Sequence, residues 1–171
     1  MNPRWPPKKD TLNQPLRIGV IGSGSVSDSV GELAKEVGSA IARAEAIVVC
    51  GGLGGVMAAV AAGAAEEGGV VIGILPGSDP TDAAPGISIP LPTGLGEARN
   101  VLVVRSSEAV IAISGEWGTL SEAAFCRKFH VPLIGLETDL PSNVLEEIAS
   151  GPSEAVARAV ELAEAGRRSS S

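Results

Sequence analysis

Four glycines in five positions follow a short apolar run in the first half of the chain. The run ends at Cys50, and Gly51, Gly52, Gly54 and Gly55 come next, before a stretch rich in small residues. A strand that breaks into glycines and restarts as a helix leaves backbone N–H groups at a helix N-terminus, where the helix dipole favours negative charge. Glycines also let an anion approach the backbone closely. The pattern is typical of a phosphate cradle, although a helix packed close to a sheet requires similar glycines.

Two further turns carry small or polar residues suited to an anionic ligand. One lies at positions 22–25 after the apolar run LRIGVIG, and the other is the segment SGEWGTLSE at 114–122. If the strands before these turns are parallel, all three turns meet at the carboxyl edge of one sheet, where such folds bind ligands. The candidate ligand-binding residues are Gly22, Ser23, Gly24, Gly51, Gly52, Gly54, Gly55, Met57, Gly115, Trp117, Gly118 and Thr119.

Several of these positions also have a structural interpretation. The first turn resembles the start of a dinucleotide fingerprint, but the third glycine of that motif is absent, which disfavours an NAD site. Thr119 and Glu122 fit the capping-box pattern S/T-x-x-E. Trp117 could stack on a base or cover a subunit interface. Met57 is also compatible with ordinary packing.

The charged residues near these turns indicate the chemistry of the site. Arg99 stands in the small and apolar segment GLGEARNVLVV, so it needs a polar partner, either a ligand or a carboxylate of Glu97 or Glu122. Glu116 places a carboxylate beside the third turn. We expect it to repel a phosphate unless it points away or binds a metal.

Composition favours one α/β domain. The chain has 171 residues, 44% hydrophobic and only 2% aromatic, with 22 glycines, so its core must consist of Val, Ile, Leu and Ala. Such a core suits a parallel sheet between close-packed helices. We predict a single Rossmann-like, doubly wound, mostly parallel sheet with helices on both faces over residues 15–166. Residues 1–14 are predicted to form a flexible arm, and residues 167–171 a frayed tail.

Apolar runs alternate with helical segments along this domain. Strands are predicted at about 16–22, 46–50, 70–75, 87–91 and 108–114, and a strand near 131–137 is expected to close the sheet. Helices are expected at 29–44, with Ser27 or Asp28 as N-cap, at 54–67, from about 96 and from about 119. One or two C-terminal helices, broken near Gly151, complete residues 143–166.

Charge and cysteine content exclude several classes of function. The net charge of −7 argues against sequence-independent nucleic-acid binding. Cys50 and Cys126 have neither the number nor the spacing of a disulfide framework or a metal site, which indicates a reducing compartment. Because no secretory or membrane-spanning run is visible, we expect no membrane partner and a cytoplasmic location.

Three blocks, CGGLGGVM, PTGLGEARN and GEWGTLSE, occur in this order. Between about Arg17 and Leu136 the chain resembles the superfamily once labelled lysine-decarboxylase-like. It contains the LOG cytokinin-activating phosphoribohydrolases and the molybdenum cofactor carrier proteins. The resemblance implies a Rossmann-like fold, a homodimer or homotetramer, and a nucleotide-like phosphate bound on two glycine loops. LOG enzymes cleave the N-glycosidic bond of nucleoside 5′-monophosphates, and their catalytic arginine and glutamate match Arg99 and Glu122.

Departures from the LOG pattern favour the carrier branch. Asn100 stands where LOG enzymes have lysine, and Ser114, Gly115 and Glu116 replace their PGG. GLGEARN is similar to the carrier-protein segment, which implies binding of a pterin through its phosphate. The prediction is a carrier or sensor of a nucleotide monophosphate or phosphorylated pterin, with a LOG-like phosphoribohydrolase as the alternative. No cofactor is expected for catalysis. An amino-acid decarboxylase is disfavoured, because no lysine stands where a pyridoxal Schiff base would form.

Overall fold

The computed structural model describes residues 14–169, within which seven strands form one sheet. All the strand pairs are parallel, in the order β4-β3-β2-β1-β5-β6-β7. The chain order reverses at β1, which pairs with both β2 and β5 and so forms the topological switch point. The strands are β1 (Arg17–Gly22), β2 (Ile47–Cys50), β3 (Val71–Leu75), β4 (Ile89–Pro92), β5 (Ala109–Ile113), β6 (Leu133–Leu136) and β7 (Glu147–Ile148).

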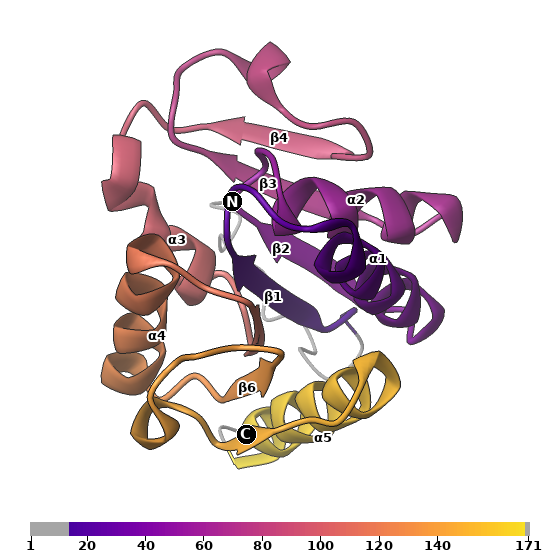
Figure 1. Ribbon diagram of the computed structural model, residues 1–171, viewed down its shortest axis with the longest axis vertical. Coiled ribbons are helices and arrows are strands. Elements are labelled where there is room, and N and C mark those ends of the chain that lie inside the picture. The colour runs from indigo at the N-terminus through magenta and orange to yellow at the C-terminus, as the bar shows by residue number, and fades with distance from the viewer. Residues whose placement is uncertain (1–13, 170–171) are drawn as a thin grey trace, which may run out of the picture.

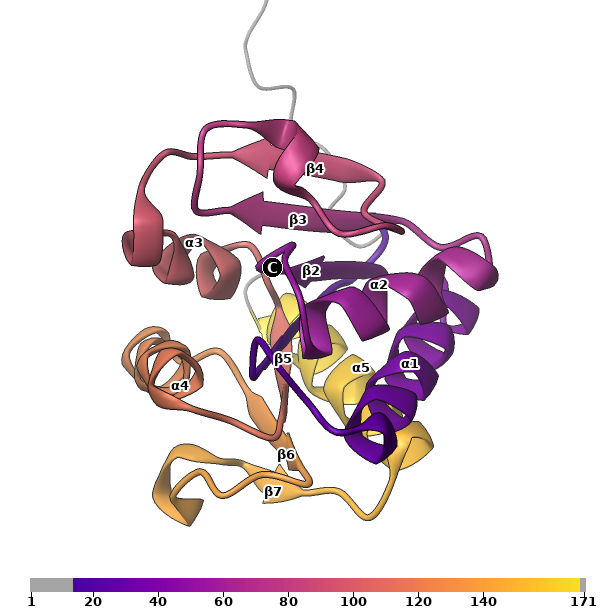
Figure 2. The same ribbon diagram turned by 45° about the horizontal axis from the view of Figure 1, so that its top comes forward.

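Helices cover both faces of the sheet, which confirms the predicted fold class. Figure 2 shows α1, α2 and α5 on one face and α3 and α4 on the other. Figure 1 shows the same layers with β1 near the middle of the molecule. The α-helices are α1 (Asp28–Arg43), α2 (Val56–Glu66), α3 (Asn100–Arg105), α4 (Trp117–Phe129) and α5 (Pro152–Ser169). The 3-10 helices are η2 (Pro80–Asp82), η3 (Gly96–Arg99) and η4 (Ser142–Val144). Among residues 14–169, no helix has the length and apolar character needed to cross a membrane.

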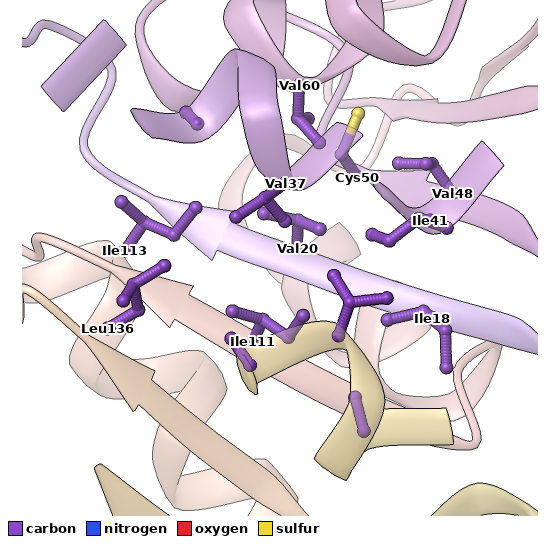
Figure 3. Packing of buried hydrophobic residues seen from close by; sticks show 14 of the residues in the cluster. Ile18, Val20, Val37, Ile41, Val48, Cys50, Val60, Ile111, Ile113 and Leu136 are labelled. Carbon is purple, nitrogen blue, oxygen red and sulfur yellow. The ribbon is translucent and has the colours of Figure 1, made fainter. Parts of the chain in front are cut away.

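Branched aliphatic side chains form the larger core, between the sheet and α1, α2 and α5. Ile18 and Val20 of β1 and Ile111 of β5 lie close to Val37 of α1 and Val60 of α2 (Figure 3). All five residues of β5 are buried, because helices cover both of its faces. This explains why its sequence, AVIAI, is apolar throughout instead of alternating.

α1 and α2 contact each other through backbone atoms at two glycines. A Cβ added at Gly38 would lie 2.0 Å from the Val60 carbonyl oxygen, and one added at Gly63 would lie 1.9 Å from the Lys35 carbonyl oxygen. The Ser39 hydroxyl also donates a hydrogen bond to the Gly63 carbonyl, at 3.0 Å. Glycine at both positions is therefore required for the helices to lie this close.

The C-terminal part differs from the sequence prediction. The strand predicted near 131–137 is β6, but β7 forms the edge of the sheet beyond it. Residues 143–166, where one or two helices were predicted, contain the end of η4, then β7 and most of α5. A strand of two residues gives no periodic signal that a sequence pattern can detect.

α5 also continues through Ser169, so residues 167–169 are helical where a frayed tail was predicted. The Arg167 guanidinium explains the difference. It binds the Glu108 carboxylate, with Nη2 2.8 Å from Oε2, and the backbone carbonyls of Gln14 and Pro15. The rest of the predicted arm and tail, residues 1–13 and 170–171, lies outside the described residues.

The α1–α2 contact generates a stability prediction. Gly63→Ala should lower the free energy of unfolding by about 1–3 kcal/mol, because the added methyl group forces two backbones apart. Gly31→Ala in α1 is the matched control, since its Cβ would meet only Val26 Cγ2, at 3.9 Å. It should stabilise the protein by about 0.5–1 kcal/mol through the helix preference of alanine. Urea unfolding of both variants measures the difference, and equal effects would contradict the assigned contact.

The ion pair of Glu108 predicts a pH dependence of stability. Burial raises the pKa of Glu108, but hydrogen bonds from Arg167 and from the Arg17 backbone N–H outweigh it and hold the pKa below 4.5. A carboxyl with a depressed pKa in the folded state stabilises the protein above its unfolded pKa, and this contribution is lost as the pH falls through the folded value. Glu108→Gln should therefore lower stability at pH 7 and make it less sensitive to pH below 4.5. Thermal unfolding between pH 3 and 7 measures this, and parallel curves for the two proteins would refute it.

Candidate functional site

A cavity of about 280 Å³ lies at the carboxyl edge of the sheet, at the switch point between β1, β2 and β5. The three turns singled out from the sequence meet there, as predicted, and η3 supplies a fourth wall. The lining residues are Val20, Ile21, Gly22, Ser23, Gly24, Gly51, Leu53, Met57, Glu97, Arg99, Asn100, Glu116, Gly118, Thr119 and Glu122.

Glycine is needed at several positions of the second turn, for a different structural reason at each. Gly55 has φ +61°, and a Cβ there would lie 2.2 Å from the Ser23 carbonyl oxygen, which also accepts a hydrogen bond from Val56 N–H. A Cβ on Gly54 would lie 3.1 Å from the Gly24 carbonyl oxygen, and one on Gly52 would meet Leu75. Gly52, Gly54 and Gly55 thus hold the turn against its neighbours and do not line the cavity.

Gly51 lines the cavity, and its missing side chain makes room for an arginine. A Cβ there would lie 2.6 Å from Arg99 Nη2 and 2.6 Å from Met57 Sδ. Arg99 is the last residue of η3 and only 6% exposed. Its guanidinium therefore packs against the end of β2, close to the first turn of α2, which contains Met57.

Arg99 and Glu122 face each other in this buried environment. Arg99 Nη1 lies 3.7 Å from Glu122 Oε1 and donates a hydrogen bond to Asn100 Oδ1. Arg99 Nε is buried and has no hydrogen-bond partner among the described residues. Arg99 therefore both pairs with a carboxylate and lines the cavity. The sequence had left an ion pair and a ligand contact as alternatives for this residue. Glu97 lines the cavity, but no ion pair joins it to Arg99 in residues 14–169.

Burial determines the protonation of Glu122. It is the main cause of a pKa of about 8 for this carboxyl; the charge of Arg99 lowers the pKa, and the charge of Glu97 raises it. The distance to Arg99 is too long for a direct hydrogen bond, so the ion pair does not compensate the desolvation. Glu122 is therefore mostly protonated at pH 7, and the buried pair carries a net positive charge.

α2 and α4 begin at the cavity without a side-chain cap. α1 begins elsewhere, and the Ser27 hydroxyl caps it by accepting a hydrogen bond from Val30 N–H at 3.4 Å. The N-cap residues of α2 and α4, Gly55 and Glu116, make no such bond. First-turn N–H groups without a protein partner are available to an anion.

The capping-box prediction for Thr119 and Glu122 is wrong. α4 begins at Trp117, so Thr119 already lies inside the first turn and cannot be the N-cap. Both residues are buried at the cavity wall instead, with 2% and 6% of their surfaces exposed. The local pattern S/T-x-x-E does not reveal where the preceding loop turns into helix.

Glu116 neither points away from the cavity nor has the surroundings of a metal ligand. It lines the wall, and its Oε1 accepts a hydrogen bond from the Ser23 hydroxyl at 3.0 Å. Within residues 14–169, no three His, Cys, Asp or Glu side chains are grouped to hold a metal ion. The carboxylate therefore links the first and third turns across the cavity.

Gly115 and Trp117, which were also predicted to bind the ligand, do not line this cavity. Trp117 is 86% exposed and lies in a separate hollow of about 380 Å³ with Leu120, Leu140 and Pro141. Gly115 lines the same hollow. The interpretation of Trp117 as a ligand contact thus has no support from its position.

The site residues predicted from the sequence leave out six residues of the wall: Val20, Ile21, Leu53, Glu97, Asn100 and Glu116. Leu53 lies between the glycines of the second turn, and this position in the loop could have indicated that it lines the cavity. Asn100 is adjacent to Arg99 in the sequence, but its role depends on α4, which is distant in the chain.

Comparisons with known proteins agree with this architecture. An uncharacterized protein of Archaeoglobus fulgidus is 39% identical over 145 residues, which are 82% of this chain and 92% of that protein. The molybdenum cofactor binding protein of the phototrophic bacterium Rippkaea orientalis has 33% identity and a TM-score of 0.82, covering 88% of this chain and 98% of its own. The molybdenum cofactor carrier protein of Chlamydomonas reinhardtii has 31% identity and a TM-score of 0.78, covering 87% and 98%.

These likenesses confirm the resemblance to the superfamily that contains the molybdenum cofactor carriers. A family model also matches residues 15–165, which include all the strands of the sheet and the whole cavity. The chain therefore belongs to the SLOG cluster4 family.

Proposed function

We propose that this protein is a carrier that binds a phosphorylated small molecule in the cavity at the carboxyl edge of the sheet. A phosphorylated pterin of the molybdenum cofactor type is the first candidate ligand, and a nucleoside monophosphate is the second. The observation that carries the proposal is the buried guanidinium of Arg99, whose Nε–H has no partner among the described residues. The two solved relatives bind or carry the molybdenum cofactor, which supports the same class of ligand here.

An oxyanion would complete the environment of Arg99. A buried donor without a hydrogen bond is costly, and a buried cation needs a compensating charge. Nη1 already donates to Asn100, and Glu122 is mostly neutral at pH 7 because burial raises its pKa to about 8. A phosphate oxygen would supply both the missing charge and the missing acceptor.

The charges on the cavity wall predict where the phosphate binds. Arg99 lies beside Gly51 and Met57, at the uncapped N-terminus of α2, so two positive features coincide at that end. Glu116 occupies the N-cap position of α4, where its carboxylate disfavours an anion. The phosphate should therefore bind between Arg99 and α2. Because Glu97 and Glu116 are exposed, solvent screens their repulsion.

The cavity holds part of a ligand of this size and leaves the remainder at its mouth. Its volume of about 280 Å³ lies just below the range for small-molecule sites, roughly 300–1,000 Å³. A phosphate and the adjoining atoms fit inside, while a ring system would extend beyond the cavity into solvent. A carrier needs this access, since it must hand its ligand to another protein.

A phosphoribohydrolase is the second candidate, because Arg99 and Glu122 line the same cavity. Such an enzyme would use an ionised Glu122 to stabilise an oxocarbenium-like transition state and orient water. The raised pKa of Glu122, about 8, leaves little of the ionised form at pH 7. The unliganded site thus favours binding over hydrolysis.

The first test measures the cargo directly. The protein is purified without oxygen from a host that makes the molybdenum cofactor, and bound molybdenum and pterin are measured by mass spectrometry and fluorescence. Arg99→Ala should reduce both about tenfold or more, since a charge-assisted bidentate contact is lost. Arg43→Ala is the matched control, because Arg43 lies at the far end of α1 and pairs with Glu67. It should retain the wild-type content.

Two outcomes, of this measurement and of added nucleoside monophosphates, would reject the carrier function. The first is that the wild-type protein contains no molybdenum, pterin or nucleotide and does not bind nucleoside monophosphates when they are added. This result would refute the binding of a phosphorylated ligand at this site. Release of free base from a nucleoside 5′-monophosphate, abolished in Arg99→Ala and Glu122→Gln, would establish the hydrolase.

The protonation of Glu122 predicts how binding depends on pH. As the pH rises through about 8, Glu122 ionises, neutralises Arg99 and repels the ligand. The affinity for guanosine 5′-monophosphate, measured by calorimetry, should fall about tenfold between pH 7 and 9, the order expected for a partly buried charge nearby. Glu122→Gln should lack this fall. The same nucleotide is used with both proteins, so its own ionisation does not affect the difference between the two pH profiles. Identical pH profiles of the wild type and Glu122→Gln would contradict the role assigned to Glu122.

A further inference from the structure

The Asn100 side chain connects Arg99 to α4. Its Oδ1 accepts a hydrogen bond from Arg99 Nη1, and its Nδ2 donates to the Ser121 hydroxyl at 3.0 Å. Ser121 Oγ then donates to the Gly118 carbonyl oxygen at 2.7 Å. These hydrogen bonds form a relay, Arg99–Asn100–Ser121–Gly118, from η3 to the first turn of α4.

The direction of each bond in the relay follows from chemistry. A guanidinium has only donors, so the Asn100 oxygen must face Arg99 and its amide nitrogen must face Ser121. The Ser121 hydroxyl oxygen then accepts the hydrogen bond from Asn100, and its proton is donated to the Gly118 carbonyl oxygen. Asn100 is only 4% exposed, so water cannot readily replace these partners. The relay has one consistent arrangement and therefore defines one orientation of the guanidinium.

We propose that Asn100 and Ser121 are positioning residues that hold the Nη1 side of the Arg99 guanidinium toward the protein and leave its Nε side for the ligand. This inference rests on the proposed function of the cavity. Nη1 is engaged by Asn100 and faces Glu122, whereas Nε has no partner among the described residues. A guanidinium held in this way offers Nε–H and an Nη2–H as a fork to two oxygens of one phosphate.

The relay explains why residues outside the direct ligand contact should affect affinity. Ser121 does not line the cavity, and its hydroxyl reaches Arg99 through Asn100. Without the relay, the guanidinium could turn and satisfy Nε elsewhere, so part of the binding free energy would be spent on reorienting it. The expected effect is a loss of ligand affinity with little change in the fold.

Three variants separate orientation from packing. Asn100→Leu keeps the branched shape of the side chain and removes both hydrogen bonds. Ser121→Ala removes only the far end of the relay. Ser121→Thr is its matched control, because a helical threonine retains a hydroxyl that can bond the carbonyl three residues earlier, here that of Gly118. Circular dichroism and thermal unfolding establish that each variant is folded.

The first measurement needs no ligand. Nitrogen-15 NMR of the Arg99 side chain should show two separate Nη signals in the wild-type and Ser121→Thr proteins, because the bond to Asn100 slows rotation about Nε–Cζ. The signals should merge in Asn100→Leu and broaden in Ser121→Ala. An unchanged pair of signals in folded Asn100→Leu would overturn the proposal.

The second measurement is calorimetric titration with guanosine 5′-monophosphate at pH 7. Asn100→Leu should raise Kd about tenfold, the size expected for loss of one hydrogen bond to a charged group, and Ser121→Ala should raise it severalfold. Ser121→Thr should match the wild type. Equal affinity of all four proteins would overturn the positioning role while leaving the proposed function intact. If the wild type binds no ligand, the proposed function fails, and the NMR result alone decides the orientation.

Discussion

A buried guanidinium whose charge is only partly compensated is the constraint on which this cavity depends. Arg99 is 6% exposed and ends a 3-10 helix, so it cannot reach bulk solvent without moving the backbone. Its acidic neighbour, Glu122, stands 3.7 Å away and is itself neutralised by burial, which raises its pKa to about 8. The site therefore keeps a positive charge in a small volume, where electrostatic attraction to an anion is stronger than in water.

The glycines matter because they let segments of backbone come close to one another. Gly38 and Gly63 bring α1 and α2 together, and this contact fixes the direction in which α2 leaves the sheet. Gly55 then fits α2 against the Ser23 carbonyl, and Gly51 leaves room for Arg99. A chain with few aromatic residues can make such contacts because its core consists of small and branched side chains that pack at short distances between layers.

The distribution of charge separates binding from turnover. Arg99 and the start of α2 lie at one end of the cavity, and the exposed carboxylates of Glu97 and Glu116 lie on its other walls. A ligand held at its phosphate by the first group would meet acceptors along the rest of its length. Burial raises the pKa of Glu122, the carboxyl next to Arg99, so it favours the protonated form, whereas stabilising the transition state of glycosidic-bond hydrolysis would need the ionised form.

The sequence alone was enough to predict strands β1 to β6, the parallel sheet and the meeting of three turns at its carboxyl edge, but it did not indicate β7. These properties follow from local patterns, because apolar runs and glycine turns recur along the chain and parallel connections obey general rules. It also singled out Arg99 and Glu122. Only the tertiary structure shows that α4 begins at Trp117, that Gly54 and Gly55 support the turn and do not line the cavity, and that Trp117 lies in another hollow. It also decided the protonation of Glu122 and the bond between Asn100 and Ser121. Each of these depends on the distance between segments far apart in the chain, and that distance is set by packing between layers, which no local pattern records.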